Sequence, residues 1–288
     1  MKKVDVNFGR TGFVKLTYPK VLREAVVKAM ESWKGFCDLP LDVKMSLPYS
    51  NGADGVGYEF KPGEGLTDDR KENFDVTIAG QDWLRDRTEL LRDSGTLDFV
   101  TDSVQLVRLM KPLIMRFADA VEEQYGISGF AEEVDASEAK FFVRFIHYLP
   151  DERTDEDAVK PGDPTATAHV DQSGFTLHLF ESAPGLQCLW EDHETAEPEW
   201  MDMPVHKGTT VIIPAMQLQL RSEGKLTALA HRVVATKKTA KTGRYSAVCF
   251  VQLKNTPKYD KERCGRLQLK KPGFNYGMKP KTFAKLFK

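Results

Sequence analysis

The sequence predicts one α+β domain, in which a distorted jelly roll (a double-stranded β-helix) is supported by N-terminal helices and closed by a C-terminal lid. Apolar residues recur with helical spacing in residues 1–140, whereas from 141 to 253 they alternate with polar residues in short runs separated by Gly, Pro and Asp turns. A chain of 288 residues that is 41% hydrophobic can bury a sizeable core, so residues 1–288 are expected to form a single domain.

A first helix is expected in "YPKVLREAVVKAMESWKGF" (18–36), with Gly35 marking its end. Its apolar side chains recur on one side of the helix, so this helix should pack against another element. That face consists of Val21, Leu22, Ala25, Val26, Ala29, Met30 and Trp33.

A second helix is expected between Thr101 and Tyr125, kinked or broken at Pro112 and ended by Gly126. Between the two helices, residues 50–70 are rich in glycine and acidic residues but lack the spacing of a phosphate-binding loop, so nucleotide binding is not expected. The apolar stripe of the second helix is Val104, Val107, Ile114, Phe117 and Val121.

Residues 141–253 have the short, regularly spaced strands of an antiparallel sandwich or barrel. A jelly roll closes most of its sheet edges and leaves a cavity between its sheets that can hold a metal. Residues 254–288 contain eleven Lys or Arg and two acidic residues, which predicts a basic tail or lid with a helix at "KTFAKLFK" (281–288).

His169, Asp171 and His231 are the candidate metal ligands. The first two are spaced HxD in "TATAHVDQSGF", and a strand sends residues i and i+2 to the same face, while His231 arrives from another strand. Two imidazoles and one carboxylate on one side of an ion leave open positions opposite, as in non-heme Fe(II) sites. The pair alone is a weak signal that also occurs in zinc sites.

Arg244 and Ser246 also share one strand face, in "GRYSAVCFVQL". A guanidinium binds a carboxylate through two parallel hydrogen bonds, and a hydroxyl two residues further on supplies a third. The pair therefore suits the distal carboxylate of a dicarboxylate ligand. A buried salt bridge is the alternative for Arg244.

Residues Phe141 to Leu253 resemble the catalytic core of the isopenicillin-N-synthase-like branch of the 2-oxoglutarate- and Fe(II)-dependent oxygenases. Four segments carry the resemblance in the expected order: "RFIHYLP" (144–150), "HVDQSGFTLHLFESAPGLQCL" (169–189), "QLQLRSEGKLTALAHRVV" (217–234) and "GRYSAVCF" (243–250).

The resemblance implies an enzyme that uses Fe(II), 2-oxoglutarate and O₂ to hydroxylate, desaturate or cyclise a small organic substrate, forming succinate and CO₂. It implies His169, Asp171 and His231 as iron ligands, and Arg244 and Ser246 as partners of the 2-oxoglutarate tail. The iron centre itself carries out the oxidation, so no separate acid or base is expected.

Other residues follow from the resemblance less directly. Tyr148 is a further expected 2-oxoglutarate contact, with simple core packing as the alternative. "GYEFKPGEGLTDDRKENFDV" (57–76) resembles the family's N-terminal part more loosely and places Tyr58 and Phe60 over the cavity mouth. Arg221, before Ser-Glu-Gly where the family has Ser-Asn-Gly, is expected on the substrate side. His178 falls on the opposite strand face from His169 and is expected to be structural.

Two other functions remain open. Relatives of this fold include Fe(II) oxidases that do not use 2-oxoglutarate and keep the arginine-serine pair, and succinate formation distinguishes these from oxygenases. A non-catalytic jelly roll that only binds a ligand would contain no iron and consume no O₂.

Composition limits the partners. The net charge is −1 and the pI about 6.6, so no overall field attracts nucleic acid or anionic membranes, and small molecules are the expected partners. No export signal or membrane-spanning run is present, and the four cysteines, Cys37, Cys188, Cys249 and Cys264, lack CxxC spacing and are expected to be reduced thiols. A cytoplasmic monomer or weak homodimer is expected.

Overall fold

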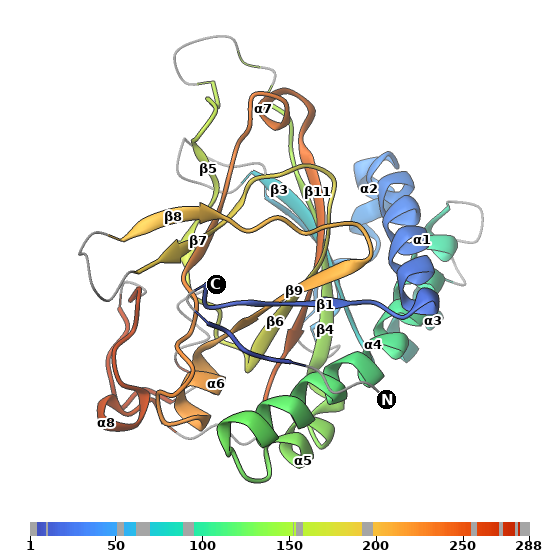
Figure 1. Cartoon of the computed structure of the whole chain (residues 1–288). Helices are drawn as coiled ribbons and strands as arrows, with labels where there is room; N and C mark the ends of the chain where they lie inside the picture. The colour runs from blue at the N-terminus through green and yellow to red at the C-terminus, as the bar shows by residue number, and fades with distance from the viewer. Residues whose placement is uncertain are drawn as a thin grey trace.

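The structure is a computed structural model, which describes residues 5–9, 11–50, 55–61, 70–88, 95–151, 153, 158–191, 198–254, 258–270, 273–279 and 282. The strands among these residues form two antiparallel sheets that face each other (Figure 1). The larger sheet has seven strands in the spatial order β1 (Val14–Thr17), β9 (Thr209–Pro214), β6 (Phe175–Glu181), β11 (Arg244–Val251), β4 (Phe141–Tyr148), β3 (Lys71–Thr77) and β2 (Gly57–Lys61).

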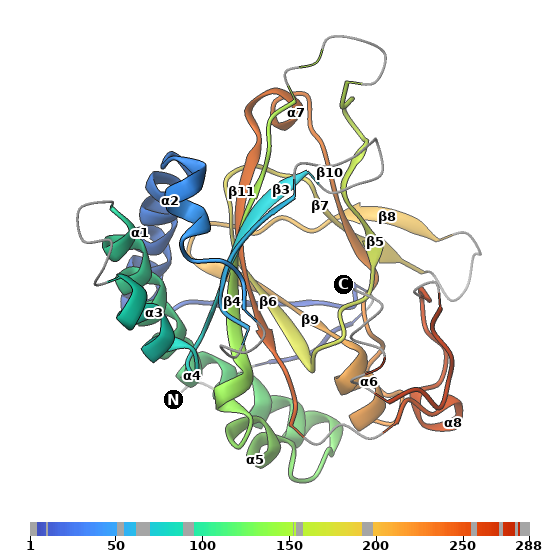
Figure 2. The ribbon, with the colours of Figure 1, turned by 180° about the vertical axis from the view of Figure 1, so that it is seen from behind.

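The smaller sheet has four strands. From β4 to β11 the chain passes back and forth between the two sheets, as in a jelly roll, with the consecutive strands β7 and β8 both in the smaller sheet. Both views show it on the side of the larger sheet opposite α1 and α4 (Figures 1 and 2). In spatial order its strands are β5 (Pro164–His169), β10 (His231–Val234), β7 (Leu186–Trp190) and β8 (Glu199–Asp202).

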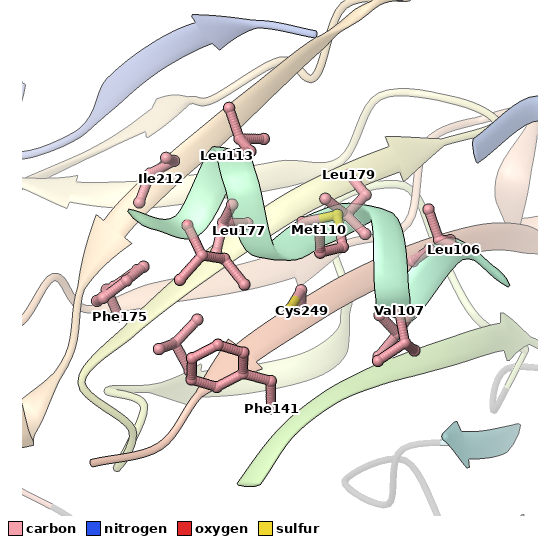
Figure 3. Close-up of a cluster of buried hydrophobic side chains, with 14 of the residues drawn as sticks. Leu106, Val107, Met110, Leu113, Phe141, Phe175, Leu177, Leu179, Ile212 and Cys249 are labelled. Carbon is pink, nitrogen blue, oxygen red and sulfur yellow. The ribbon is translucent and has the colours of Figure 1, made fainter. Parts of the chain in front are cut away.

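Helices cover the other face of the larger sheet (Figure 2). The long helix α4 packs against α1 and lays its apolar stripe on this sheet (Figure 3). In the described part of the chain the helices before β4 are α1 (Lys20–Cys37), α2 (Leu41–Met45), α3 (Gln81–Thr88), α4 (Thr96–Tyr125), α5 (Phe130–Asp135) and η3 (Glu138–Lys140). The short helices α6 (Met216–Arg221), α7 (Thr239–Thr242) and α8 (Lys261–Cys264) lie outside this layer.

Alternation along β4 separates two cores. Val143 and Phe145 belong to the cluster under the helices, whereas Ile146 and Tyr148 belong to a cluster between the two sheets. Because successive strand residues point to opposite faces, Phe142 and Arg144 must also point between the sheets. The inner face of the larger sheet is therefore partly polar, and the outer face is mostly apolar, with Glu72 and His147 as polar exceptions.

Residues 1–140 contain the helices α1 to α5, and they also contain β1, β2 and β3, which were not predicted and which extend the larger sheet. These strands are short. Two of them flank a glycine-rich stretch, and in that sequence context the alternation of apolar and polar residues that indicates a strand is hard to recognise. The first helix continues past Gly35 to Cys37, and Val21 is 55% exposed rather than on the packed face.

The second helix begins at Thr96, earlier than the expected Thr101, and runs without a break through Pro112 to Tyr125, so of the two outcomes expected at Pro112 a break is excluded. Gly126 follows it in the left-handed conformation, φ 63°, which confirms this glycine as the end of the helix. The predicted C-terminal helix at 281–288 lies, apart from residue 282, outside the described residues. No helix in the described ranges is long and apolar enough to cross a membrane, and all four cysteines are buried free thiols.

Trp33 tests the packing of α1. Its ring is fully buried and contacts the rings of Phe36, Phe99 and Phe145. Trp33→Ala should lower the free energy of unfolding by about 3–5 kcal/mol through lost burial and a residual cavity. Val21→Ala on the exposed side of the same helix should change it by less than about 0.5 kcal/mol. Urea unfolding measures both, and a loss below about 1 kcal/mol for Trp33→Ala would contradict the assigned core.

Candidate metal centre

Three predicted side chains meet at one point between the sheets. His169 ends β5 and His231 begins β10, and the two are direct partners in the antiparallel ladder. Asp171 follows β5 by two residues, and its carboxylate lies 3.5 Å from Nε2 of His169 and 3.8 Å from Nε2 of His231. One ligand atom from each residue lies within 4.8 Å of the others, so the three can hold one ion.

Backbone carbonyls fix the tautomer of both imidazoles. Nδ1 of His169 lies 2.7 Å from the carbonyl oxygen of Thr167, and Nδ1 of His231 lies 3.1 Å from that of Leu229. A carbonyl oxygen only accepts hydrogen bonds, so each Nδ1 carries the proton and each Nε2 presents its lone pair toward Asp171. This is the arrangement in which metal-bound histidines are held.

Asp171 is buried, and the hydroxyl of Thr176 on β6 donates a 2.6 Å hydrogen bond to its Oδ2. Burial alone would raise the pKa of this carboxyl group, but the two histidines and Thr176 outweigh it and hold the pKa well below its usual range.

The pKa values of the two histidines are shifted in opposite directions. Burial lowers the pKa of His231 to about 4, so this imidazole is neutral at neutral pH and available as a ligand. Burial also acts to lower the pKa of His169, but the Asp171 carboxylate stabilises the ring when Nε2 carries a proton as well, and this overrides burial and raises the pKa. A metal ion bound at Nε2 would take the place of that second proton. The donor set of two imidazoles and one carboxylate fits Fe(II) with open coordination positions.

His178 corrects an expectation. The strand faces suggested that it points away from His169, but its ring lies 5.6 Å from that of His231, edge-on at 85°. His169 and His178 stand on different strands joined by a turn, and parity along the chain is not kept across a turn. Nε2 of His178 is buried and has no hydrogen-bond partner among the described residues, and burial lowers its pKa to about 3.

Arg244, Ser246 and Tyr148 also lie in this interior. Arg244 and Tyr148 are cross-strand partners on β11 and β4, and both are buried. The guanidinium is engaged: Nη2 lies 2.6 Å from Oε2 of Glu181, and Nε donates a 2.9 Å hydrogen bond to the carbonyl of Ala183. The buried salt bridge, considered as the alternative to cosubstrate binding for Arg244, is therefore present, and the guanidinium also lies in the interior.

Glu181 was not singled out from the sequence, although a glutamate closing the apolar run "FTLHLFE" is a signal of a buried partner. Its Oε1 accepts a 2.9 Å hydrogen bond from the Val205 amide, so both carboxylate oxygens are used. The contacts of Arg244 occupy its Nε–Nη2 edge. Within the described ranges no group accepts a hydrogen bond from Nη1, and Arg244 lines a small pocket with Tyr148 and Thr165.

The three residues expected on the substrate side, Tyr58, Phe60 and Arg221, do not lie at this centre. The Tyr58 hydroxyl donates a 2.6 Å hydrogen bond to Glu72, and its ring packs on Phe36 of α1, so it faces the helices. Phe60 follows by two residues on β2, on the same strand face. Arg221 pairs with Glu133 of α5 at 2.8 Å. A sequence match to a loop does not determine which side of a sheet the loop's side chains reach.

Tyr58 instead contacts a second group of possible ligands, Cys37, Glu72 and His147, under the helices. Here the Glu72 carboxylate accepts hydrogen bonds from Lys44 at 2.7 Å and Tyr58 at 2.6 Å, and Nδ1 of His147 lies 2.8 Å away. These contacts hold the pKa of Glu72 at about 2 despite burial. Its oxygens are satisfied by the protein, which makes this cluster a structural network.

Residues 140–253 match the family model of the 2OG-Fe(II) oxygenase superfamily, and this range contains all three candidate ligands and the Arg244–Ser246 pair. The superfamily uses Fe(II), 2-oxoglutarate and O₂. No curated protein matches the chain.

Solved oxygenases share the fold. A full-length Neurospora crassa protein in complex with alpha-KG and thymine is 20% identical, with a TM-score of 0.66, covering 96% of this chain and 87% of that one. The dioxygenase for auxin oxidation 1 of Arabidopsis thaliana with 2-oxoglutarate is 17% identical, with a TM-score of 0.64, covering 86% and 85%. A putative oxygenase from Shewanella oneidensis is 22% identical, with a TM-score of 0.60, covering 84% and 82%. These matches confirm the predicted double-stranded β-helix.

Metal binding tests the three ligands. The protein should bind about one Mn(II) per chain, and His231→Ala should abolish this binding because it removes a ligand from a three-residue set. His206→Ala changes an exposed histidine outside the centre and should bind as the unchanged protein does. Elemental analysis and calorimetry measure both variants, and full metal content in His231→Ala would refute the assignment.

Thr176→Val probes the support of Asp171. The substitution keeps the shape and removes only the hydroxyl that orients the carboxylate, so Mn(II) affinity should fall about tenfold. Thr88→Val removes an equally buried hydroxyl that bonds to the carbonyl of Leu84 in α3, and it should leave Mn(II) affinity unchanged. Equal affinities in the two variants would show that Thr176 does not orient the ligand.

Proposed function

Because the chain carries a 2OG-Fe(II) oxygenase domain at residues 140–253, we propose that His169, Asp171 and His231 hold its iron and that the enzyme hydroxylates a small organic molecule, with desaturation or ring closure as other outcomes of the same oxidation. Arg244, Ser246 and Tyr148 are proposed to bind 2-oxoglutarate. The Fe(II)–2-oxoglutarate pair, when bound, supplies the activation of O₂, with succinate and CO₂ as products.

One observation carries the ligand assignment. Two imidazoles, each fixed by a backbone carbonyl at Nδ1, turn Nε2 toward the same buried carboxylate. When both histidines are neutral, lone pairs of the two Nε2 atoms and of the carboxylate point at one another with no proton between them. This is unfavourable unless a cation lies between them.

Arg244 is suited to a second carboxylate. Glu181 and the Ala183 carbonyl hold the guanidinium at its Nε–Nη2 edge, so its orientation is fixed before any ligand arrives. Nη1 and the hydroxyl of Ser246, two residues along the same strand face, remain for the distal carboxylate of 2-oxoglutarate. Tyr148, whose ring lies 5.7 Å from the Arg244 guanidinium, forms the adjacent wall.

The remaining proposals concern the setting of the enzyme. The nearly neutral net charge and the family support a small-molecule substrate and give no support for nucleic acid. Four buried free thiols support a reducing compartment, and we place the enzyme in the cytoplasm as a monomer or weak homodimer.

Arg244→Lys tests the 2-oxoglutarate site. Lysine keeps the charge opposite Glu181 but cannot form two parallel hydrogen bonds, so 2-oxoglutarate affinity should fall by about 1–3 kcal/mol, or roughly 5- to 150-fold. Mn(II) affinity should stay the same, because no metal ligand changes. Calorimetry on the Mn(II)-loaded protein measures both constants.

Arg153→Lys is the matched control, since Arg153 lines the same pocket but pairs with Asp151. It should change 2-oxoglutarate affinity by no more than about twofold. An equally small change in Arg244→Lys would exclude Arg244 as the cosubstrate residue. Stoichiometric succinate formation during substrate oxidation separates the oxygenase from an oxidase of the same fold.

A further inference from the structure

On the inner face of the larger sheet, residues that are direct partners on neighbouring strands form rows that run across the strands. Two of these rows end next to the metal centre. One runs from Asp75 through Arg144 and Val248 to His178, which contacts His231. The next runs from Thr77 through Phe142 and Phe250 to Thr176, which bonds to Asp171.

The proposed 2-oxoglutarate residues lie in the other two rows. Arg244 pairs with Tyr148, and Ser246 pairs with Ile146 and Glu181. On β11 the residues of these two rows, Arg244 and Ser246, come before Val248 and Phe250. The two rows that hold the proposed cosubstrate residues are therefore separate from the two rows that end at the metal centre. Arg144 stands two strands from His178, a separation of about 10 Å. A substrate bound next to the iron would therefore contact the rows of Arg144 and Phe142.

Side chains in these rows remain accessible although they point between two sheets. Phe142 and Phe250 are only half-buried and stack on each other, with ring centroids 4.8 Å apart and an interplanar angle of 21°. The Arg144 side chain is 31% exposed, and its guanidinium carbon lies 5.8 Å from both ring centroids. A packed interior would cover such groups, so the face is open to a ligand here.

The charge of Arg144 is already compensated. Its Nε and Nη2 each donate a 2.7 Å hydrogen bond to the Asp75 carboxylate, which is 2% exposed. Among the described residues, Nη1 is left to donate to a ligand. A carboxylate placed here would lie beside Asp75 without a free cation in these rows, and a cation would face the guanidinium, so an uncharged ligand is favoured.

Asn73 adds an independent sign of a ligand. It lies on β3 opposite Ile146, at the far end of the row of Ser246, and this row adjoins the row of Asp75 and Arg144. Its side chain points to the same face as Asp75 and is fully buried. Neither its amide nitrogen nor its amide oxygen has a hydrogen-bond partner in the described part of the chain. An unpaired buried amide destabilises the folded protein, and such a group persists where a ligand satisfies it.

We propose that Phe142, Arg144 and Phe250 bind the substrate of the proposed oxygenase, that this substrate is an uncharged planar ring bearing a carbonyl group, and that Asn73 pairs with an amide-type edge of it. The rings of Phe142 and Phe250 contact the flat face, and Nη1 of Arg144 donates to the carbonyl oxygen. The inference rests on the proposed function, because the iron and 2-oxoglutarate assignments define which side of the centre is free.

Calorimetry on the full chain loaded with Mn(II) and 2-oxoglutarate tests it. The probes are uncharged planar lactams and cyclic imides, uracil among them, and planar aryl carboxylates of matched size, benzoate among them. The best uncharged probe should bind at least about tenfold more tightly than any carboxylate. Asp75→Asn, which leaves the Arg144 charge uncompensated, should move this preference toward the carboxylates by at least about tenfold.

Asn73→Leu separates binding from stability. It should weaken the best uncharged probe at least about tenfold while raising Tm by about 2–4 °C, because it removes an unpaired buried amide. A structural role would lower Tm instead. Phe250→Leu should weaken the probe too, whereas Phe180→Leu, on the helix side of β6, should not.

The outcomes are distinct. Preference for carboxylates in the unchanged protein, binding of neither series, or unaltered probe affinity in both Asn73→Leu and Phe250→Leu would overturn the inference while Mn(II) and 2-oxoglutarate still bind. Failure of Mn(II) or 2-oxoglutarate to bind would overturn the proposed function, and this inference with it.

Discussion

The antiparallel pairing of β5 with β10 is the constraint on which the centre depends. It makes His169 and His231 direct neighbours, and the carbonyl oxygens of Thr167 and Leu229 accept the Nδ1 hydrogen bonds of these two histidines. The donor atoms are thereby oriented by main-chain geometry, with little side-chain freedom left to lose on metal binding. Asp171 is added from the following turn, and β6 holds it through Thr176.

The larger sheet supports this centre by separating two environments. Its outer face is sealed by α1 and α4 around a cluster of aromatic rings, including Trp33, Phe99 and Phe145. That apolar packing provides the burial energy of the domain. Because stability is supplied on one face, the inner face can keep accessible rings, paired arginines and an unpaired asparagine, groups that a core serving stability alone would exclude.

The sequence was sufficient where the relevant geometry is local. Spacing by two residues placed Arg244 with Ser246, because strand alternation is fixed by the backbone. The same spacing found Asp171 beside His169, although Asp171 follows the end of β5 and comes from the turn after it. The sequence was insufficient where cross-strand register decides. The partner of Arg244 depends on the pairing of β6 with β11, which contains a register shift between Ala247 and Val248. Likewise, nothing local determines that Tyr58 turns toward Glu72 and away from the cavity.

Arg144 and Arg244 show one solution to a common problem. A guanidinium inside the roll must be paired, or its desolvation would cost several kcal/mol. In both cases a buried carboxylate takes the Nε–Nη2 edge: Asp75 with both oxygens for Arg144, and Glu181 with one oxygen for Arg244, beside a carbonyl. Each arginine is thus neutralised and still keeps Nη1 as a donor. If the two arginines had no carboxylate partners, the interior would be expected to attract any anion. Paired as they are, they are directional hydrogen-bond donors, so selectivity between cosubstrate and substrate depends on what else surrounds each Nη1: the Ser246 hydroxyl for one, and the aromatic pair Phe142 and Phe250 for the other.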